Sequence, residues 1–367
     1  MKIGLLTMHA VKNFGSFLQT YATLQILRNL GHEPFVINYI SPNRTLWSNI
    51  MRVSSPKWKR NILSRSIYRF CYLPEALINH ILFGKCIKKE FPLTKVYHSC
   101  EDMAGKIDAD AFIVGSDKVW SFSCNDGLDQ SYFLRFTSCT KKISYSSSIG
   151  DFELNKTEIE QLAENLKDFS AISVREFATK EFLSREGLDV SIAIDPVLML
   201  SQNEWLNFAS NSKLKLPKRP YLLMYMFGRE TDPVRMAAEY AKSTGFDIVR
   251  IGWDFTNRQY CKDVRAYINP YDFVKLFANA QYVVTNSFHG TAFSILFNKQ
   301  FSITRDRFDA RFAAILELAG LESRFHNSAY SDITISKFDE QIDYSKVNKK
   351  IDIIRQQSRQ FINKSLQ

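Results

Sequence analysis

The sequence of 367 residues lacks any apolar run that approaches the roughly 20 residues needed to span a bilayer. Residues 1–7 contain no long apolar stretch followed by a small-residue cleavage site, so we expect a first buried strand there rather than a secretory signal. Low-complexity tracts and short-period repeats are also missing. These absences argue against a membrane-spanning protein, an exported protein and a repeat protein.

Cysteine is sparse, and the spacing of the cysteines does not indicate a metal site. None of the six cysteines forms a C-x-x-C pair, and no histidine accompanies them at zinc spacing. A chain of this length does not need disulfides to fold. We therefore expect free thiols in a reducing cytosol, no metal site and no bound cofactor.

The charge balance is strongly basic, with 48 Lys and Arg against 38 Asp and Glu and a formal net charge of +10. Such an excess favours an anionic partner, but no standard nucleic-acid-binding motif is present, so we expect no nucleic acid partner. Much of the excess falls in residues 44–95, where basic and aromatic side chains alternate. That segment is either a solvated helical face or a binding patch.

The sequence predicts two successive series of alternating strands and helices. Short buried runs alternate with helix-like segments, which is typical of parallel sheets with right-handed crossovers. Within the first series, residues 44–95 interrupt the alternation of strands and helices and are expected to form a helical region inserted into the first domain. The strands are expected at 2–7, 34–39, 110–114, 142–146, 171–174, 190–194, 221–225, 247–251, 282–285 and 301–303.

The predicted fold class is therefore α/β, with two doubly wound Rossmann-like domains facing a cleft. We expect the domains to cover 1–172, with the basic helical insertion 44–95, and 173–367, with a C-terminal helix at 347–364. Open parallel sheets bind ligands beyond the carboxyl ends of their strands. Polar residues after the strands are thus the first candidates for a site.

Five such strand ends are unusually polar. They are Asn13-Phe14-Gly15-Ser16, Gly115-Ser116-Asp117, Ser147-Ser148-Ile149-Gly150, Arg175-Glu176 and Ser287-Phe288-His289-Gly290. A single polar residue after a strand is often only a helix cap. Five on the same edge of two sheets favour a site.

At these residues the chain resembles the polysaccharide pyruvyl transferase family. The resemblance extends from Lys2 to about Phe325, with the motifs in the order and approximate spacing of the family. Lys118 stands where the family usually has Gln. The motifs are KIGLLTMHAVKNFGSFLQTYAT at 2–23, DAFIVGSDKVW at 110–120, KISYSSSIG at 142–150, SVREFATKEFL at 173–183, IDPVLML at 194–200 and VVTNSFHGTAFSILFNKQF at 283–301.

The resemblance implies a fold like that of the GT-B glycosyltransferases, with phosphoenolpyruvate as donor and a sugar diol as acceptor. The product would be a cyclic pyruvate ketal, with phosphate released. Such enzymes act on bacterial surface polysaccharides, often while the glycan is attached to a lipid carrier. The donor side is expected in the second domain and the acceptor side in the first.

The reaction that the resemblance implies suggests roles for particular residues. Planar arginines suit the phosphate and carboxylate of the donor, and histidine moves protons near neutral pH. We expect His289 and Arg175 to be catalytic. The expected donor-binding residues are Arg175, Ser287, His289, Gly290, Arg305, Arg307 and Arg311, and the expected acceptor-binding residues are Asn13, Gly15, Gln19, Ser116 and Asp117.

Structural alternatives stay open at several of these positions. His289 is alternatively a helix-capping histidine, and Arg175-Glu176 a surface ion pair. The three arginines of 305–311 are alternatively a solvated face, and Asn13 and Gln19 are alternatively turn and helix stabilisers. We interpret Asp195-Pro196 as a structural turn.

Two other functions remain in view. A GT-B glycosyltransferase using a nucleotide sugar would have the same fold, but no G-x-x-G-E run is evident in the second half. A scaffold of polysaccharide assembly would use only the basic segment. We expect a cytoplasmic enzyme that touches the inner membrane face through Lys57, Lys59, Arg60, Arg65 and Arg69, interleaved with Trp47, Trp58 and Tyr68.

Overall fold

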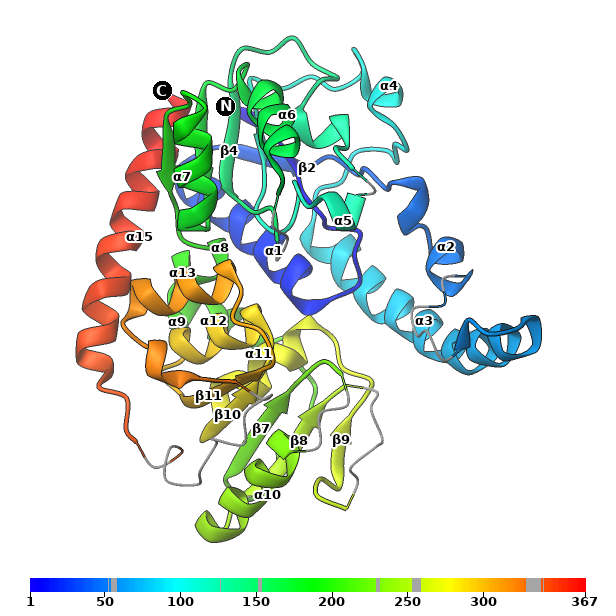
Figure 1. Ribbon diagram of the computed structural model, residues 1–367, viewed down its shortest axis with the longest axis vertical. Coiled ribbons are helices and arrows are strands. Elements are labelled where there is room, and N and C mark those ends of the chain that lie inside the picture. Colours follow the sequence, from blue (N-terminus) through cyan, green and yellow to red (C-terminus); the bar gives the residue numbers. More distant parts are fainter. Residues whose placement is uncertain are drawn as a thin grey trace.

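The computed structural model describes residues 1–51, 53, 58–125, 127–150, 154–228, 232–252, 259–327, 338 and 340–367. Two α/β domains lie one above the other in Figure 1, and each is built on one parallel sheet flanked by helices. The predicted fold class is confirmed.

The first sheet has six parallel strands in the order β2-β1-β3-β4-β5-β6. Its chain order reverses between β1 and β3, which is the point where doubly wound sheets open a ligand crevice. Its strands are β1 (Lys2–Leu6), β2 (Glu33–Val36), β3 (Ala111–Val114), β4 (Lys142–Ser147), β5 (Ala171–Val174) and β6 (Val190–Ile192).

The second sheet also has six parallel strands, in the order β12-β11-β10-β7-β8-β9. Its order reverses between β7 and β10, so its own crevice opens there. The short edge strands β9 and β12 were not predicted. The strands are β7 (Tyr221–Tyr225), β8 (Asp247–Ile251), β9 (Asp263–Arg265), β10 (Tyr282–Thr285), β11 (Gln300–Arg305) and β12 (Phe325–Asn327).

Helices cover both sheets and join the domains. Helix α1 packs on α8 and α11, so a helix of the first domain is part of the interface with the second.

The helices around the first sheet are α1 (Phe14–Asn29), α2 (Leu46–Met51), α3 (Ile62–Glu90), α4 (Cys100–Met103), α5 (Phe122–Asn125), α6 (Lys156–Leu166) and α7 (Phe177–Arg185). The remaining helices are α8 (Pro196–Met199), α9 (Gln202–Ala209), α10 (Asp232–Thr244), α11 (Pro270–Asn279), α12 (Phe288–Leu296), α13 (Ala310–Ala319) and α15 (Tyr344–Leu366). Short 3₁₀ turns lie at Pro42–Arg44, Gln130–Phe133 and Glu322–Arg324.

The domain boundary expected at 172/173 requires correction. That position cuts through β5, and both β5 and β6 pair into the first sheet. The first domain therefore runs to Ile192, and Arg175 belongs to it. The chain then enters the second domain through residues 193–220.

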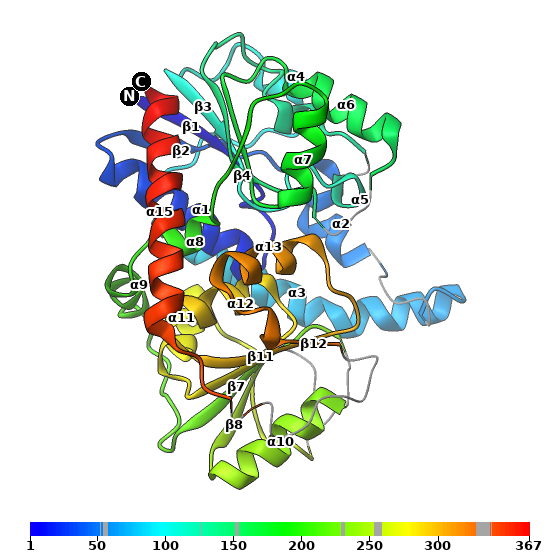
Figure 2. The same ribbon diagram turned by 60° about the vertical axis from the view of Figure 1, so that its left-hand side comes forward.

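Helix α15 is longer than the predicted 347–364 and spans both domains (Figure 2). At its start, the Tyr344 hydroxyl donates to the carbonyl of Ser294 in the second domain, at 3.3 Å. Further along, the Ser358 hydroxyl accepts the backbone N–H of Ile194 at 2.9 Å. At its end, Lys141 Nζ of the first domain donates to the Gln367 carbonyl at 3.0 Å.

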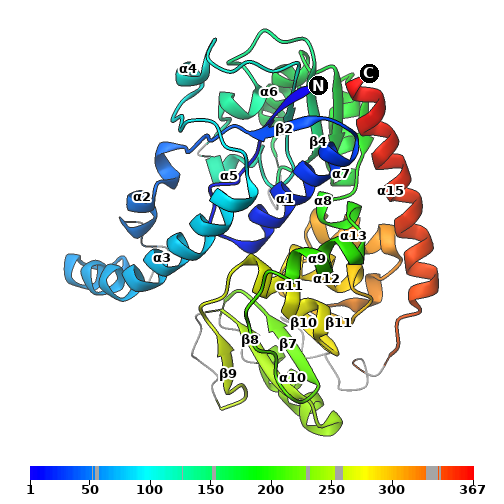
Figure 3. The same ribbon diagram turned by 180° about the vertical axis from the view of Figure 1, so that it is seen from behind.

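The expected helical insertion is observed. Helices α2 and α3 form most of 44–95, and α3 projects from the body of the molecule in Figure 3. Its N-terminal half is largely exposed, whereas Ala76, Phe83, Cys86 and Ile87 of its second half are buried. None of the helices within the described ranges combines the length and apolarity that crossing a membrane requires.

Candidate active site

A cleft of about 700 Å³ opens where the two sheets face each other at their carboxyl ends. The first domain contributes the loops after β1, β3 and β5. The second domain contributes the residues after β7, β10 and β11. Because both switch points open into this cleft, its position follows from the order of strands in the two sheets.

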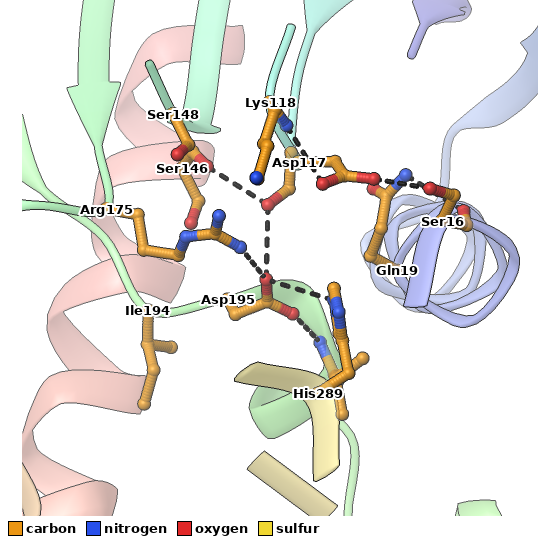
Figure 4. A network of polar contacts seen from close by, with 12 residues as sticks. Ser16, Gln19, Asp117, Lys118, Ser146, Ser148, Arg175, Ile194, Asp195 and His289 are labelled. Atoms are coloured by element: carbon orange, nitrogen blue, oxygen red, sulfur yellow. Dashed lines mark hydrogen bonds and ion pairs between the residues drawn. The ribbon is translucent and has the colours of Figure 1, made fainter. Parts of the chain in front are cut away.

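Asp195 is buried behind the lining of the cleft, where it joins the two domains (Figure 4). Its Oδ2 atom accepts a hydrogen bond of 2.7 Å from Arg175 Nη1 and one of 3.3 Å from the Ser116 hydroxyl. The same oxygen lies 3.7 Å from His289 Nε2. Its Oδ1 caps α8 by accepting the N–H of Val197. The carboxylate therefore fixes Arg175 of the first domain next to His289 of the second.

Arg175 is buried and held on three sides. Its Nε donates to Glu176 Oε1 at 3.3 Å, and its guanidinium lies 4.1 Å from the centre of the Phe288 ring. Glu176 is itself buried and accepts a 2.5 Å hydrogen bond from the Ser148 hydroxyl. The pair is thus not the surface ion pair considered above. Burial opposes the charge of Arg175, but Glu176, Asp195 and Asp117 outweigh it and raise its pKa, so it stays cationic.

His289 is the second residue of α12, one position beyond Phe288 and two beyond the N-cap Ser287. Burial lowers the pKa of His289 below its ordinary value of 6.5, against the opposing effect of Asp195 and Asp117. The imidazole is therefore neutral at pH 7. Within the described part of the chain its Nε2 has no hydrogen-bond partner, because 3.7 Å exceeds hydrogen-bond length. His289 lines the cleft, and a neutral imidazole in that position suits proton transfer.

Asp117 provides a carboxylate on the wall of the cleft. Its Oδ2 accepts the Ser16 hydroxyl at 2.5 Å, and its Oδ1 accepts the N–H of Lys118 at 2.9 Å. Burial opposes ionisation, but His289, the Ser16 hydroxyl and Arg175 together lower the pKa of Asp117. It is therefore an anion at neutral pH. A carboxylate beside a serine hydroxyl suits the hydroxyl groups of a sugar.

Positive charge dominates the lining of the cleft. The field of such a lining attracts small anions into a space walled by protein. Lys12 is partly desolvated there, and burial lowers its pKa to about 8. The basic lining residues are Lys12, Arg44, Lys118, Arg175, Arg305 and Arg311, and the acidic ones are Asp117 and Asp306.

Most of the predicted site residues meet in this cleft. They include both members of the predicted catalytic pair. Asn13 plays two parts, since it lines the cleft and its side chain caps α1 by accepting the N–H of Ser16. The predicted residues that line the cleft are Asn13, Gly15, Asp117, Arg175, Ser287, His289, Arg305 and Arg311.

Four predicted residues are not among the described residues that line the cleft. Gln19 is buried inside the first domain, where its amide donates to the Thr7 hydroxyl at 2.8 Å. Ser116 lies behind the lining and bonds Asp195 instead. Arg307 is exposed outside the cleft. At Gly290 a Cβ would lie 2.2 Å from the Thr285 hydroxyl, so this glycine serves close packing of α12 on β10 rather than substrate approach.

The sequence analysis missed Asp195 as a site residue. Asp195-Pro196 does form a turn that caps α8, but the carboxylate also organises the cleft. Lys12 and Arg44 were not predicted either, and both line the cleft. The signal for Asp195 was available, since it directly follows the strand-like run 190–194. Among the residues that the structure describes, no group of His, Cys, Asp and Glu has the arrangement of a metal site.

Fold and site together define the class. Two Rossmann-like domains face a polar cleft, with a C-terminal helix spanning both, which is a GT-B-like architecture. The model of the polysaccharide pyruvyl transferase family matches residues 13–303. The chain therefore belongs to the polysaccharide pyruvyl transferase family.

Solved structures are similar to this chain at low sequence identity. The UDP-GlcNAc 2-epimerase from Neisseria meningitidis, solved with bound UDP-GlcNAc, is 9% identical with a TM-score of 0.52 over 100% of this chain and 99% of that one. The UDP-GlcNAc 2-epimerase from Methanocaldococcus jannaschii is 11% identical with a TM-score of 0.47, over 96% and 92%. The E. coli ADP-heptose LPS heptosyltransferase II is 10% identical with a TM-score of 0.39, over 97% and 99%. No curated protein matches the chain.

Proposed function

We propose that this protein transfers the pyruvyl group of phosphoenolpyruvate to two hydroxyls of one sugar. The acceptor is a bacterial surface polysaccharide or its lipid-linked precursor, and the products are a pyruvate ketal and inorganic phosphate. The family match over residues 13–303 supports pyruvyl transfer and favours it over the nucleotide-sugar alternative. Phosphoenolpyruvate is a cytosolic metabolite, so we place the reaction in the cytoplasm.

One observation carries the proposal, namely the convergence of Arg175 and His289 on Asp195 in a cationic cleft. Phosphoenolpyruvate carries a phosphate and a carboxylate, and guanidinium groups match both in geometry and charge. Arg175 has five N–H groups, of which the bonds to Asp195 and Glu176 use two. Arg311 and Arg305, both paired with Asp309, add positive charge on the opposite wall.

The reaction needs a proton on the methylene carbon and two new C–O bonds at the central carbon. In the first step a sugar hydroxyl adds to the central carbon, its proton leaves, and the methylene carbon gains a proton to become a methyl group. In the second step a neighbouring hydroxyl of the same sugar adds to that carbon, its proton leaves, and the C–O bond to phosphate breaks. No oxidant or reductant is required.

His289 fits the proton transfers of both steps. Because its pKa is lowered, the neutral ring can accept the proton of an attacking hydroxyl. The resulting imidazolium lies 3.7 Å from the Asp195 carboxylate, which stabilises the charge. Asp117 and the Ser16 hydroxyl, together with the amide of Asn13, offer hydrogen bonds to the sugar from the first domain.

The test is incubation of the purified protein with phosphoenolpyruvate and candidate lipid-linked or lipid-free oligosaccharides. Mass spectrometry should detect a pyruvyl increment on the glycan, with release of an equal amount of phosphate. The increment should depend on two hydroxyls of one sugar and vanish when either is blocked. Transfer of a sugar from a nucleotide sugar, without any pyruvyl increment, would contradict the proposal.

A further inference from the structure

Helix α3 exposes an apolar face that no other described element covers. The side chains of Ile62, Leu63 and Phe70 are 81%, 70% and 79% exposed. A helical residue advances by about 100°, so residues 62, 63, 67, 70, 77 and 81 share one side of the helix. The exposed large apolar side chains of α3 are Ile62, Leu63, Ile67, Phe70, Leu77 and Ile81. We call this set the α3 apolar face.

Three aromatic residues of this region, Trp58, Tyr68 and Tyr72, form a separate group. Tyr68 and Tyr72 stack on each other on the opposite side of α3, with ring centres 6.0 Å apart, and Trp58 packs against Tyr68. Tyr68 packs within this aromatic group, whereas Trp58 and Trp47 are 38% and 67% exposed, so the expectation that these three side chains meet a membrane stays a prediction. The aliphatic residues and Phe70 form the exposed stripe instead. Lys57, which was also expected to take part, lies outside the described residues.

The charge around this face has one sign. From Pro34 to Pro74 the sequence contains no Asp or Glu. Lys59 and Arg60 are exposed directly before α3. Arg65 and Arg69 donate to the carbonyls of Lys59 and Met51, which ties the chain before α3 to the helix while leaving both guanidiniums charged.

We propose that the α3 apolar face and its basic flank dock on an anionic lipid bilayer, with α3 lying in the interface rather than crossing it. An exposed apolar stripe beside basic side chains is the pattern of interfacial helices. A second copy of this chain suits the face less well, because two-fold pairing would bring the same basic flank together. Nucleic acid would use the charges but leaves the aliphatic stripe unexplained.

The same helix reaches the active site. Glu75, Asn79 and Phe83 of α3 line a side pocket of about 240 Å³, which shares Lys12 and Phe227 with the cleft. Docking through α3 would thus hold the cleft beside the bilayer. That this presents a lipid-linked acceptor rests on the proposed function, whereas docking itself rests on the surface of α3 alone.

Sedimentation with vesicles tests the docking without using enzymatic activity. We expect the protein to bind vesicles of phosphatidylglycerol and phosphatidylcholine at low salt, to bind pure phosphatidylcholine vesicles more weakly, and to lose affinity as salt rises. Exchanging Leu63→Ser together with Phe70→Ser should weaken binding at least about 100-fold, since two large apolar side chains no longer leave water. Exchanging Lys59→Gln together with Arg60→Gln should weaken it about 30-fold at low salt.

Matched controls lie elsewhere on the surface. Leu206→Ser and Ile353→Ser remove large apolar side chains that are 46% and 55% exposed on α9 and α15, and they should leave binding unchanged. Lys156→Gln with Lys346→Gln removes two exposed charges away from α3 and should have little effect. Circular dichroism establishes that the variants fold.

Three outcomes overturn the proposal. They are wild-type protein that stays in the supernatant with anionic vesicles at low salt, binding that survives Leu63→Ser with Phe70→Ser, and a wild-type dimer that the same double variant dissociates in the absence of any vesicle binding. Turnover of a lipid-free acceptor, measured in parallel, should be the same in the double variant and the wild type. Vesicle binding without pyruvyl transfer would refute the proposed function and leave the docking intact.

Discussion

Gly15 and His289 touch across the domain interface. A Cβ built on Gly15, at the start of α1, would lie 2.1 Å from His289 Nδ1. Only a residue without a side chain allows the first turn of α1 to approach the imidazole. The position of the ring in the cleft thus depends on a glycine of the other domain.

Gly15→Ala should therefore displace His289 or α1 and reduce turnover on the order of 100-fold, as a misplacement of about 1 Å commonly does. Gly84→Ala is the matched control, because among the described residues a Cβ there meets nothing within 4 Å. This control should keep full activity and gain slightly in helix stability. Steady-state kinetics of both variants gives the answer, and equal activities would contradict the role of this contact.

His289→Gln should reduce turnover about 10²- to 10⁴-fold while preserving the fold. In the wild type, kcat/KM should fall as pH drops, because protonation removes the base. The midpoint should lie below the ordinary histidine value of 6.5, since burial lowers the pKa of His289. Near-normal turnover of the variant, with an unchanged circular dichroism spectrum, would remove His289 from the mechanism.

Asp195→Asn should destabilise the protein by about 3–5 kcal/mol, because it leaves the buried Arg175 without one of its counter-charges. Activity should fall as well, since Arg175 and His289 lose their common anchor. Asp168→Asn is the control, as Asp168 pairs with Arg135 on the surface and should contribute at most about 1 kcal/mol. Urea unfolding of the two variants compares them directly, and similar losses would argue against the central place of Asp195.

Arg175→Ala and Arg311→Ala should each weaken phosphoenolpyruvate binding by about 2–5 kcal/mol, because a charge-assisted contact to an anion is lost. Arg307→Ala should leave the affinity unchanged, since this residue is exposed outside the cleft. Titration calorimetry with phosphoenolpyruvate alone measures all three. An effect of Arg307→Ala as large as that of Arg311→Ala would place the donor elsewhere.

Acid should destabilise the fold partly through His9, which is buried between the Thr7 carbonyl and Asn38. Burial lowers its pKa from 6.5 to about 4. Above pH 6.5 neither state binds a proton at this site. Between pH 6.5 and 4 only the unfolded chain binds a proton at this site. The free energy of unfolding therefore decreases by about 3 kcal/mol as the pH is lowered from 6.5 to 4.

His9→Gln keeps a side-chain amide near Asn38 but cannot titrate. The loss of stability between pH 7 and pH 4 should therefore be smaller by about 3 kcal/mol in this variant than in the wild type. Denaturant unfolding at both pH values measures the difference. Identical losses in the two proteins would show that His9 does not titrate as its burial implies.

The strand ends that make the cleft could be predicted from the sequence because each buried run is short and followed by polar residues. Asn13, Asp117, Arg175 and His289 were found in that way. The boundary between domains could not be found, because β5 and β6 have the same buried pattern whichever sheet they join. Only their pairing with β4 assigns Arg175 to the first domain.

Side-chain direction accounts for the other errors. Gln19 lies on nearly the same face of α1 as Gly15 but about one turn further along the helix, where its amide bonds Thr7 inside the first domain. Arg305, Arg307 and Arg311 are neighbours in sequence, yet only the first and last line the cleft. Asp195 was interpreted as a turn because its capping bond is local, whereas its bonds to Ser116 and Arg175 join residues distant in sequence.

Helix α15 and residues 193–195 both cross between the domains, and the N–H of Ile194 bonds the Ser358 hydroxyl where they meet. Because these two connections lie side by side, we expect the domains to rotate about a hinge that passes through both of them. Sliding of one domain past the other would be resisted. Asp195 lies on this hinge and is bonded to Arg175 of the first domain, while His289 belongs to the second domain. Opening or closing of the cleft would therefore change the distance from Asp195 to His289 more than the distance from Asp195 to Arg175. The environment of the His289 imidazole would thus indicate whether the domains are open or closed.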